Sequence, residues 1–320
     1  MSGPVVIAEV VRSGFVEGHH YGSVVALAAD GSVDWSVGDV TSPVFPRSCN
    51  KPLQARGMVD LGLDLPPDLL ALACASHSGE PMHVDGVRRI LAGAGLDESA
   101  LQTPPDVPLD DDERDTWLRA GRAREPIAMN CSGKHAAMVA TCALHGWDVA
   151  TYRDAGHPLQ RALATTFADL TGEPVAATGI DGCGAPLFSA SLVGLARGFA
   201  ALASATDGTR HRVAEAIRAH PAMVSGTRRD ERVLLTAIPG AIGKAGAESC
   251  YAVALPDGRA FALKTDDGGQ RARPVIMAAA LRRSGVDTEP GVDTEAVRST
   301  GVHELLGGGV PVGVVRATLP

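Results

Sequence analysis

The sequence predicts an α+β fold, in which a mostly antiparallel sheet is covered by helices. Three observations lead to this prediction. Segments with the apolar and polar alternation of strands lie near both ends of the chain, and the segments between them have the apolar period of helices. The pair Asp30-Gly31 joins two alternating segments, which is a strong hairpin signal. If the first and last strands pair in one sheet, the helices between them are left to cover it.

Each predicted element follows from one of two apolar periods, two residues for a strand or 3.6 residues for a helix. The strand candidates, in chain order, are residues 5–11, 23–28, 33–37, 251–255, 259–264 and 310–315. The helix candidates are rich in Ala and Leu and span residues 84–94, 135–145, 158–170, 186–200, 209–219 and 274–283. The segment 103–112 is rich in Pro and Asp and is expected to be an exposed loop.

Composition excludes several classes of protein. The chain has 320 residues and a net charge of −8, and it contains no stripe of Lys and Arg that would follow a phosphate backbone, so nucleic acid is not an expected partner. Residues 1–20 lack the pattern of a secretory signal, and no apolar run of about 18 residues is present. We therefore expect a cytoplasmic protein that forms a single domain over residues 1–320 and does not associate with membranes.

Cysteine and lysine are the informative residue types. The six cysteines are expected to be reduced thiols, either buried or bound to a metal, because disulfides are rare in the cytoplasm. Only four of the 29 basic side chains are lysines, at positions 51, 134, 244 and 264. A lysine amine can lose its proton and then act as a base or a ligand, whereas a guanidinium cannot. Each lysine is thus either a functional residue or an ordinary surface residue.

The first motif is the Ser48-x-x-Lys51 spacing. A serine becomes a nucleophile when a nearby base takes its proton, and an unprotonated lysine one helical turn away is such a base. The alternative is that Ser48 is an ordinary cap of the helix that follows. Farther along the chain, Ser78 lies in a run of small and polar residues, and Lys264 precedes a threonine on a late strand. Together these features resemble the three-part signature of penicillin-recognising serine enzymes.

A second group of residues combines two cysteines with an amine. Cys131 and Lys134 share one glycine-containing segment, and Cys183 lies in another about fifty residues later. Two thiolates could hold a zinc ion with a third ligand from Lys134, His135 or Asp181. The alternative is that both cysteines are buried thiols on conformationally demanding turns.

Taken in order, six blocks of the sequence resemble the asparaginase II family, the type first described from rhizobia. The blocks cover positions 47–268 and are Arg47-Ser48-x-x-Lys51-Pro52-x-Gln54, Ser76-His77-Ser78-Gly79-Glu80, Asn130-Cys131-Ser132-Gly133-Lys134-His135, Gly179-Ile180-Asp181-Gly182-Cys183-Gly184-Ala185-Pro186, Lys244-x-Gly246-Ala247-Glu248 and Lys264-x-Asp266-Asp267-Gly268. The chain departs from the family pattern at Cys49-Asn50, Met129 and Ser249-Cys250, which affects the expected shape of the pocket.

The resemblance implies a fold similar to serine β-lactamases and glutaminases, and a homodimer. It also implies a catalytic centre of two Ser-Lys pairs, Ser48 with Lys51 and Ser78 with Lys264. Zinc is implied as well, held by Cys131, Lys134 and Cys183, and assisting substrate binding more than bond cleavage.

The reaction that the resemblance implies is hydrolysis of the side-chain amide of L-asparagine to L-aspartate and ammonia through an acyl-serine. The substrate-binding candidates are Arg47, Glu80, His135, Asp181 and Gly246. Three other functions stay open. One is a serine amidohydrolase that acts on glutamine or another small amide. The second is a zinc hydrolase, in which Cys131 and Cys183 hold a catalytic metal, and the third is a zinc-binding metabolite sensor on an inactive hydrolase scaffold.

Overall fold

The computed structural model describes residues 4–319, which divide into two compact units. We call them the sheet unit, residues 4–49, 190–204 and 233–319, and the helical unit, residues 50–189 and 205–232. The first and the last described residues of the chain therefore both belong to the sheet unit. This is the arrangement in which early and late strands can pair, as the sequence predicts.

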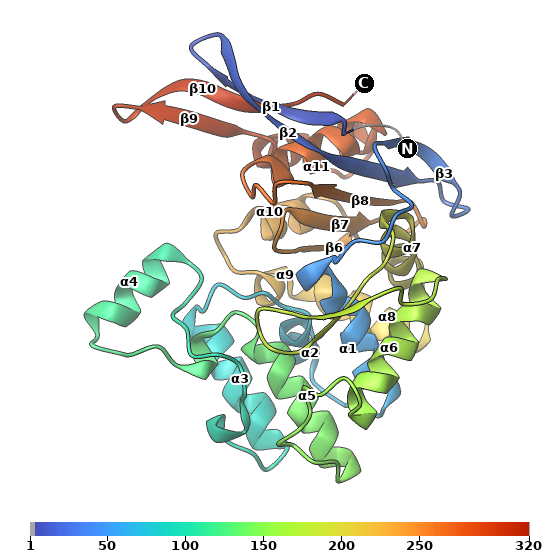
Figure 1. The fold of residues 1–320 in the computed structure, drawn as a ribbon, viewed down its shortest axis with the longest axis vertical. Helices are drawn as coiled ribbons and strands as arrows, with labels where there is room; N and C mark the ends of the chain where they lie inside the picture. The colour runs from blue at the N-terminus through green and yellow to red at the C-terminus, as the bar shows by residue number, and fades with distance from the viewer. Residues whose placement is uncertain (1–3, 320) are drawn as a thin grey trace. The chain divides into compact units, whose positions relative to one another are not determined.

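The sheet unit is built around one eight-stranded sheet (Figure 1). Its order is β6-β7-β8-β2-β1-β10-β9, β3 pairs with β2, and every pairing is antiparallel. The strands are β1 (Val6–Arg12), β2 (Phe15–Leu27), β3 (Val33–Val37), β6 (Ile242–Ala245), β7 (Cys250–Ala254), β8 (Ala260–Thr265), β9 (His303–Gly307) and β10 (Val310–Ala317). The long strand β2 links the early and late segments, because it pairs with β1, β3 and β8.

The centre of this sheet is buried on both faces. Every residue of β7 is buried, and so is nearly every residue of β8. Neighbouring residues of a strand point to opposite faces, so both faces must be covered. Two helices, α7 (Leu192–Ala203) and α11 (Ala272–Arg283), contact strands β2, β7 and β8. The unit also contains η1 (Arg47–Asn50, whose last residue belongs to the helical unit), η4 (Val286–Thr288) and α12 (Thr294–Thr300), while α10 (Asp230–Ala237) crosses the boundary between the units.

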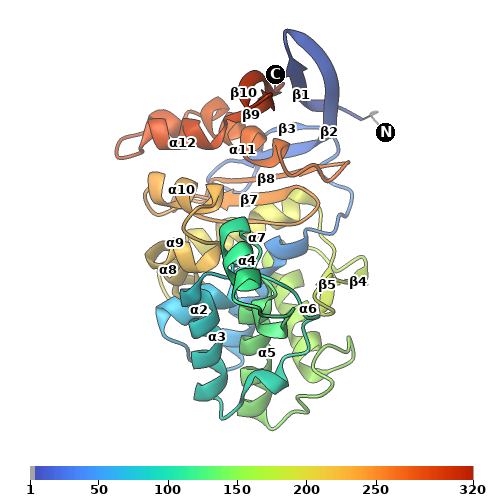
Figure 2. The same cartoon turned by 90° about the vertical axis from the view of Figure 1, so that its left-hand side faces the viewer.

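The helical unit is a group of packed helices (Figure 2). Its helices are α1 (Lys51–Asp60), α2 (Pro67–Ala73), α3 (Pro81–Gly93), α4 (Asp111–Arg119), α5 (Ser132–His145), α6 (Pro158–Thr171), α8 (Gly208–Ala219) and α9 (Pro221–Val224), with short turns η2 (Glu98–Ala100) and η3 (Pro126–Ala128). A small hairpin joins β4 (Thr178–Ile180) to β5 (Pro186–Phe188).

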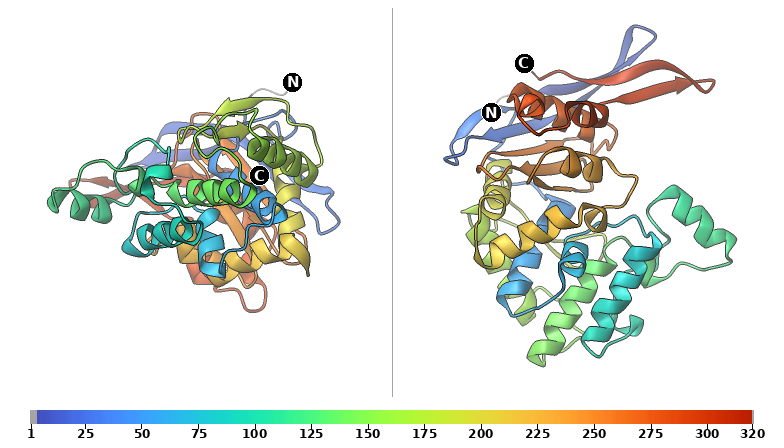
Figure 3. Two further views of the ribbon diagram at one scale, coloured as in Figure 1. Left: turned by 90° about the horizontal axis from the view of Figure 1, so that it is seen from below. Right: turned by 180° about the vertical axis from the view of Figure 1, so that it is seen from behind.

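Helix α5 lies at the centre of this group, and residues 132–142 are buried without interruption. It packs beside α3, as the right-hand view of Figure 3 shows, and also against α2. The contact with α2 depends on Gly133, because a Cβ at that position would lie 2.6 Å from the carbonyl oxygen of Leu72. The beginning of α5 therefore approaches the end of α2 closely, which places the segment with Cys131 and Lys134 next to the loop that contains Ser78.

The structure confirms the α+β prediction and all six predicted strands, although β2 begins earlier, at Phe15. The helix predicted over residues 186–200 was wrong at its start. Pro186–Phe188 pair as β5, and α7 begins at Leu192 after Ser191, whose hydroxyl accepts the N–H of Gly194.

Two further predictions near helix starts need correction. The predicted loop 103–112 ends in a helix, because the Asp110 side chain caps α4 by accepting the N–H groups of Asp112 and Glu113. Acidic residues in the first turn favour that end of a helix. Ser48 does not cap α1, since it lies inside η1 and α1 begins three residues later. Within residues 4–319, we find no helix with the length and apolar character needed to cross a membrane.

We expect Gly22→Ala to destabilise the protein, because strands β2 and β8 leave no room for a side chain at that position. A Cβ there would collide with the carbonyl of Lys264 and lie 2.8 Å from Ile7 Cδ1. Such overpacking costs about 1–3 kcal/mol. The matched control is Gly18→Ala on the same strand, where the nearest atom lies 3.9 Å away. Urea unfolding midpoints measure both, and equal midpoints would contradict the packing argument.

Candidate functional site

In the sheet unit, Ser48 lies against Gly246. Gly246 follows β6, and a Cβ added to it would lie 2.8 Å from the carbonyl oxygen of Pro46 and 3.3 Å from the backbone nitrogen of Ser48. Cys49 strengthens the same contact, because its thiol donates to the carbonyl of Lys244 at 3.0 Å. A residue with a side chain at 246 would push η1 away, so the glycine keeps Ser48 at the end of β6.

The backbone is strained on both sides of this contact. Arg47, Glu248 and Ser249 have φ angles of 53°, 56° and 54°, in the left-handed region that non-glycine residues rarely adopt. Each such residue costs on the order of 1–3 kcal/mol, and residues of this kind gather at functional sites. The Arg47 guanidinium also lies 3.4 Å from the Glu248 carboxylate. The turn 246–249 and the start of η1 therefore hold each other in an unusual conformation.

Lys264 completes this group from β8. Its amine donates to the carbonyl of Glu248 at 3.1 Å and to its neighbour Thr265 at 2.8 Å. The sheet unit thus brings together four of the predicted site residues around one turn. They are Arg47, Ser48, Gly246 and Lys264.

Arg273 is a residue that the sequence reasoning missed. It is 7% exposed near the start of α11, and its guanidinium lies 3.5 Å from the carbonyl oxygen of Gly246 and 2.5 Å from Gln270 Oε1. It also lies over the ring of Tyr251, 5.5 Å from the ring centre. Among twenty-five arginines nothing in the sequence distinguishes it, because the contact with Gly246 depends on the fold.

In the helical unit, the Lys51 amine is buried and hydrogen-bonded to the loop after α2. Lys51 is 1% exposed. Its amine donates to the carbonyl of Ala75 at 2.5 Å and to the hydroxyl of Ser76 at 2.9 Å. Ser78 is the predicted site residue of this loop, and Ser76 is the serine that contacts Lys51.

The loop itself, residues 74–80, is held by backbone hydrogen bonds from two other segments. The end of α9 and the segment before α5 supply the acceptors. The bonds join Ser76 N to Val224 O (3.2 Å), His77 N to Asn130 O (3.0 Å) and Ser78 N to Ser225 O (2.7 Å). Every polar group of a buried loop needs such a partner, so these bonds fix the direction of its side chains.

Glu80 fastens the end of the same loop. One carboxylate oxygen accepts the N–H of Thr227 and the other accepts its hydroxyl, both at 2.8 Å. Gly226, just before Thr227, has a φ of 147°, and a Cβ there would collide with the Ser78 hydroxyl. Ser78 is fully buried, and within residues 4–319 its hydroxyl oxygen has no hydrogen-bond partner. Such an oxygen is rare in proteins and is typical of a group with a chemical role.

The predicted metal ligands also meet in the helical unit. The Lys134 amine lies 3.2 Å from the Cys183 sulfur, and the Cys131 thiol can donate either to the same sulfur or to Asn130 Oδ1, which lies 3.1 Å away. Asp181 lies beside them, with Oδ2 3.8 Å from the Cys183 sulfur. His135 points into this cluster too, and its Nδ1 lies 2.6 Å from the Tyr152 hydroxyl. His135 is therefore a neighbour of the thiols, in a different unit from Arg47 and Ser48.

The electrostatics of the cluster favour a thiolate on Cys183. The hydrogen bond from Cys131 and the charge of Lys134 hold the pKa of Cys183 well below its usual range, against the effect of burial. Burial alone would lower the pKa of Lys134, but the charges of Cys183, Cys131 and Asp181 raise it. The pKa of Cys131 is raised, because its proton bonds to Cys183 and the group is buried.

Cys131 and Cys183 are residues of the kind that bind zinc. A thiolate is the form in which cysteine binds zinc, and an amine is a ligand once it has lost its proton. Within residues 4–319, no group of three or more His, Cys, Asp and Glu side chains is placed to hold a metal ion. A site at Cys131 and Cys183 would therefore depend on Lys134 as a ligand.

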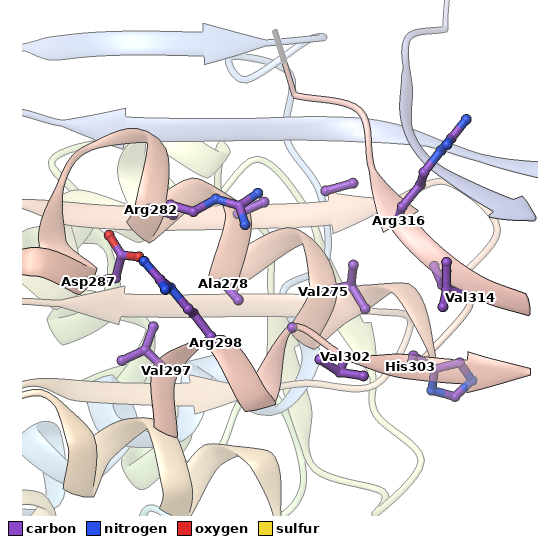
Figure 4. A pocket seen from close by; sticks show the side chains of 14 residues that line it. Val275, Ala278, Arg282, Asp287, Val297, Arg298, Val302, His303, Val314 and Arg316 are labelled. Atoms are coloured by element: carbon purple, nitrogen blue, oxygen red, sulfur yellow. The ribbon is translucent and has the colours of Figure 1, made fainter. Parts of the chain in front are cut away.

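A separate pocket of about 360 Å³ lies in the sheet unit between α11, α12 and β10. Figure 4 shows Arg298 and Asp287 pointing toward each other within it, and the Arg298 Nε lies 3.5 Å from the Asp287 carboxylate. No predicted site residue lines this pocket. The chemistry-bearing residues of the sequence analysis are elsewhere, around the turn 246–249 and the loop 74–80.

Comparison with protein families identifies the chain. Residues 8–317 match the family described as L-asparaginase II, which is nearly the whole chain. The resemblance found in the sequence analysis is thereby confirmed at the level of the family. The comparison with curated protein sequences finds no match.

Several solved structures are similar to this chain at low sequence identity. A β-lactamase from Mycobacterium bovis is 16% identical, with a TM-score of 0.42, and the match covers 82% of this chain and 94% of that one. A protein described as a putative β-lactamase from Bacteroides dorei is 15% identical, with a TM-score of 0.42, covering 82% and 93%. The native form of the protein named Mglu is 12% identical, with a TM-score of 0.38, covering 83% and 61%.

We expect Glu80→Ala to lower the free energy of unfolding by about 2 kcal/mol, because it leaves both the N–H and the hydroxyl of Thr227 without their charged acceptor. Glu80→Gln keeps one acceptor and should lose less. The control is Glu98→Ala, which removes an exposed ion pair to Arg88 and should change stability by less than about 1 kcal/mol. Urea unfolding of the three variants tests this, and a Glu80→Ala loss no larger than the control's would contradict the role of Glu80 in fastening the loop.

Proposed function

Because the chain belongs to the L-asparaginase II family, we propose that it is an L-asparaginase, which hydrolyses the side-chain amide of L-asparagine to L-aspartate and ammonia. Family membership supports an amidohydrolase. The observation that carries the proposal is that the residues of both Ser-Lys pairs are present and lie in strained or tightly held segments. Ser48 and Lys264 adjoin the turn 246–249, while Lys51 contacts the loop that contains Ser78.

The first step of the proposed reaction is acylation of Ser48. Its oxygen attacks the amide carbon while its proton passes to the unprotonated amine of Lys51. The carbon–nitrogen bond then breaks, and Lys51 returns the proton to the leaving nitrogen, which departs as ammonia. The product is an aspartyl ester on Ser48.

The second step is hydrolysis of that ester. Water attacks the ester carbon, one of its protons is taken up by the enzyme, and the ester bond breaks, which restores the Ser48 hydroxyl and releases L-aspartate. The proposal assigns Ser78 and Lys264 to this proton transfer or to holding the water. These two residues belong to different units, so their pairing rests on the family pattern. The buried and unpartnered hydroxyl of Ser78 supports a chemical role for that residue.

Recognition of the amino-acid end of the substrate is assigned to charged residues near these groups. Arg47, next to Ser48, is the candidate for the α-carboxylate. Gly246 allows the substrate to approach, because it has no side chain. Asp181 and Glu80 are the carboxylate candidates for the α-ammonium, and the oxygens of Glu80 also accept from Thr227. His135 is the second candidate for the α-carboxylate, and its Nδ1 lies 2.6 Å from the Tyr152 hydroxyl.

Zinc is part of the proposal, with Cys131, Lys134 and Cys183 as the ligands. When bound there, it would supply a positive charge that attracts an anionic substrate group. The chain's own contribution is the Cys183 thiolate, which Lys134 stabilises when no metal competes for it. The serine mechanism does not require the metal for bond cleavage.

Two other aspects are proposed on the family pattern alone. We propose a homodimer, which sedimentation measurements would test, and a cytoplasmic location. The alternative functions are a glutaminase and a zinc-binding sensor. A glutaminase would differ only in pocket depth, and relative rates on the two amides separate it from an asparaginase. A sensor would release ammonia from neither amide.

We expect the purified protein to release ammonia from L-asparagine faster than from L-glutamine, and Ser48→Ala to lower kcat by at least about a thousandfold, because it removes the nucleophile. The control is Ser42→Ala, an exposed serine that bonds to Asp39. If the folded wild-type protein released no ammonia from either amide, the amidohydrolase proposal would be wrong and the sensor would take its place.

Removal of zinc should separate a serine enzyme from a zinc hydrolase. We expect about one zinc ion per chain by elemental analysis, and its loss in Cys183→Ala but not in Cys142→Ala, a buried cysteine on α5. Chelation should raise KM and leave kcat within about threefold, since the metal assists binding only. A kcat that falls by orders of magnitude and returns with zinc would instead identify the metal as the catalytic group.

A further inference from the structure

The hydrogen bonds of Lys51 suggest a role for Ser76, which neither Ser-Lys pair includes. The Lys51 amine is 2.5 Å from the carbonyl oxygen of Ala75 and 2.9 Å from the hydroxyl oxygen of Ser76. Lys51 and Ser76 are 1% and 7% exposed, so little water competes for these bonds. Both acceptors come from consecutive residues of one loop.

The chemistry of an amine determines what these two contacts do. An unprotonated amine has two N–H bonds and one lone pair. A carbonyl oxygen accepts and cannot donate, so Ala75 must take one N–H of Lys51. If the Ser76 hydroxyl accepts the other, the lone pair is left pointing away from both, toward the third position around the nitrogen. If Ser76 instead donated its proton, it would occupy the lone pair and Lys51 could not act as a base.

The surroundings of Ser76 hold its backbone in place. Its N–H donates to Val224 at 3.2 Å, and the next N–H, of His77, donates to Asn130 at 3.0 Å. The His77 ring is also fixed, since its Nε2 lies 2.9 Å from the Ser132 hydroxyl, which itself donates to the carbonyl of Ile127. Burial, with His83 and Lys51 nearby, lowers the pKa of His77 well below its usual range, so this ring is uncharged.

We propose that Ser76 is a positioning residue for the proposed reaction. Its hydroxyl accepts the second N–H of the unprotonated Lys51 amine and so leaves the lone pair free to take up the proton of the attacking serine. When Lys51 takes up the serine proton, the bonds to Ala75 and Ser76 persist, and the new N–H occupies the third position. The amine therefore changes protonation without rearrangement, which is the condition under which fixed polar groups lower a barrier.

This inference rests on the proposed function for its kinetic part, but the hydrogen bond can be tested without a substrate. The chain has only four lysines, so a protein labelled with 15N- and 13C-lysine gives four side-chain NMR signals, and Lys51→Arg identifies the signal of Lys51. We expect Ser76→Ala to shift the Lys51 signal and leave those of Lys244 and Lys264 in place. Ser76→Thr keeps the hydroxyl and should return the Lys51 signal toward its wild-type position.

A matched control is Thr141→Val, which removes another buried hydroxyl, bonded to the Ala137 carbonyl on α5. It should leave the Lys51 signal unchanged. Thermal unfolding of each variant checks that the fold is intact. A Lys51 signal that is the same in wild type and folded Ser76→Ala would overturn the proposal, whatever the enzyme acts on.

The kinetic prediction is a loss of kcat with KM little changed. We expect Ser76→Ala to lower kcat for L-asparagine by about 10- to 100-fold, because a misdirected base costs rate in this range, and Ser76→Thr to recover most of it. A wild-type rate in Ser76→Ala would overturn the positioning role even if the NMR signal shifts. If the wild-type protein is inactive on both amides, the proposed function fails, while the NMR comparison still decides whether Ser76 orients Lys51.

Discussion

The loop of residues 74–80 determines the chemistry of the helical unit, because its buried backbone must find hydrogen-bond partners outside any helix or sheet. The end of α9 and the segment before α5 provide these partners. The loop can then offer its own carbonyl and hydroxyl oxygens to Lys51 and place the Ser78 side chain against Gly226. Three segments that are far apart in the sequence thus converge on one loop. A change in any of them moves the side chains that carry the proposed reaction.

The sheet unit solves a different problem, which is to hold a serine in a strained turn at the end of a buried strand. The left-handed residues Arg47, Glu248 and Ser249 adopt conformations that cost free energy in isolation. The central strands supply the rigidity that keeps them there, since β7 and β8 are covered on both faces. Rigid strands are a more precise support for reacting groups than loops alone. The strained residues therefore lie in the same turn as Gly246 and beside Lys264, both of which are predicted site residues.

Strands and long helices were predictable from the sequence because local periodicity and turn residues determine them, as in the Asp30-Gly31 hairpin. The family blocks also gave the candidate residues. The contacts between blocks were not predictable in the same way. Ser76 and Ser78 are two residues apart with identical side chains, and only the hydrogen bonds to Val224 and Ser225 determine which one faces Lys51. Glu80 is predicted to bind substrate, and no local pattern in the sequence shows that its two oxygens also accept from Thr227, 147 residues later. Such pairings depend on tertiary structure and leave no local pattern.

The scarcity of lysine connects the sequence with these sites. In a chain that uses arginine for most of its positive charges, Lys51, Lys134 and Lys244 are almost completely buried. A carbonyl oxygen accepts from the amine of Lys51, of Lys244 and of Lys264, while Lys134 donates to a sulfur. A guanidinium is wide and planar and stays charged. It is therefore a poorer match than an amine for a single buried carbonyl oxygen, and it cannot give up a proton there. Lysine is compact and can do both. Lysine at these four positions therefore meets a need for a small amine, and at Lys51 that amine has its two N–H acceptors already in place.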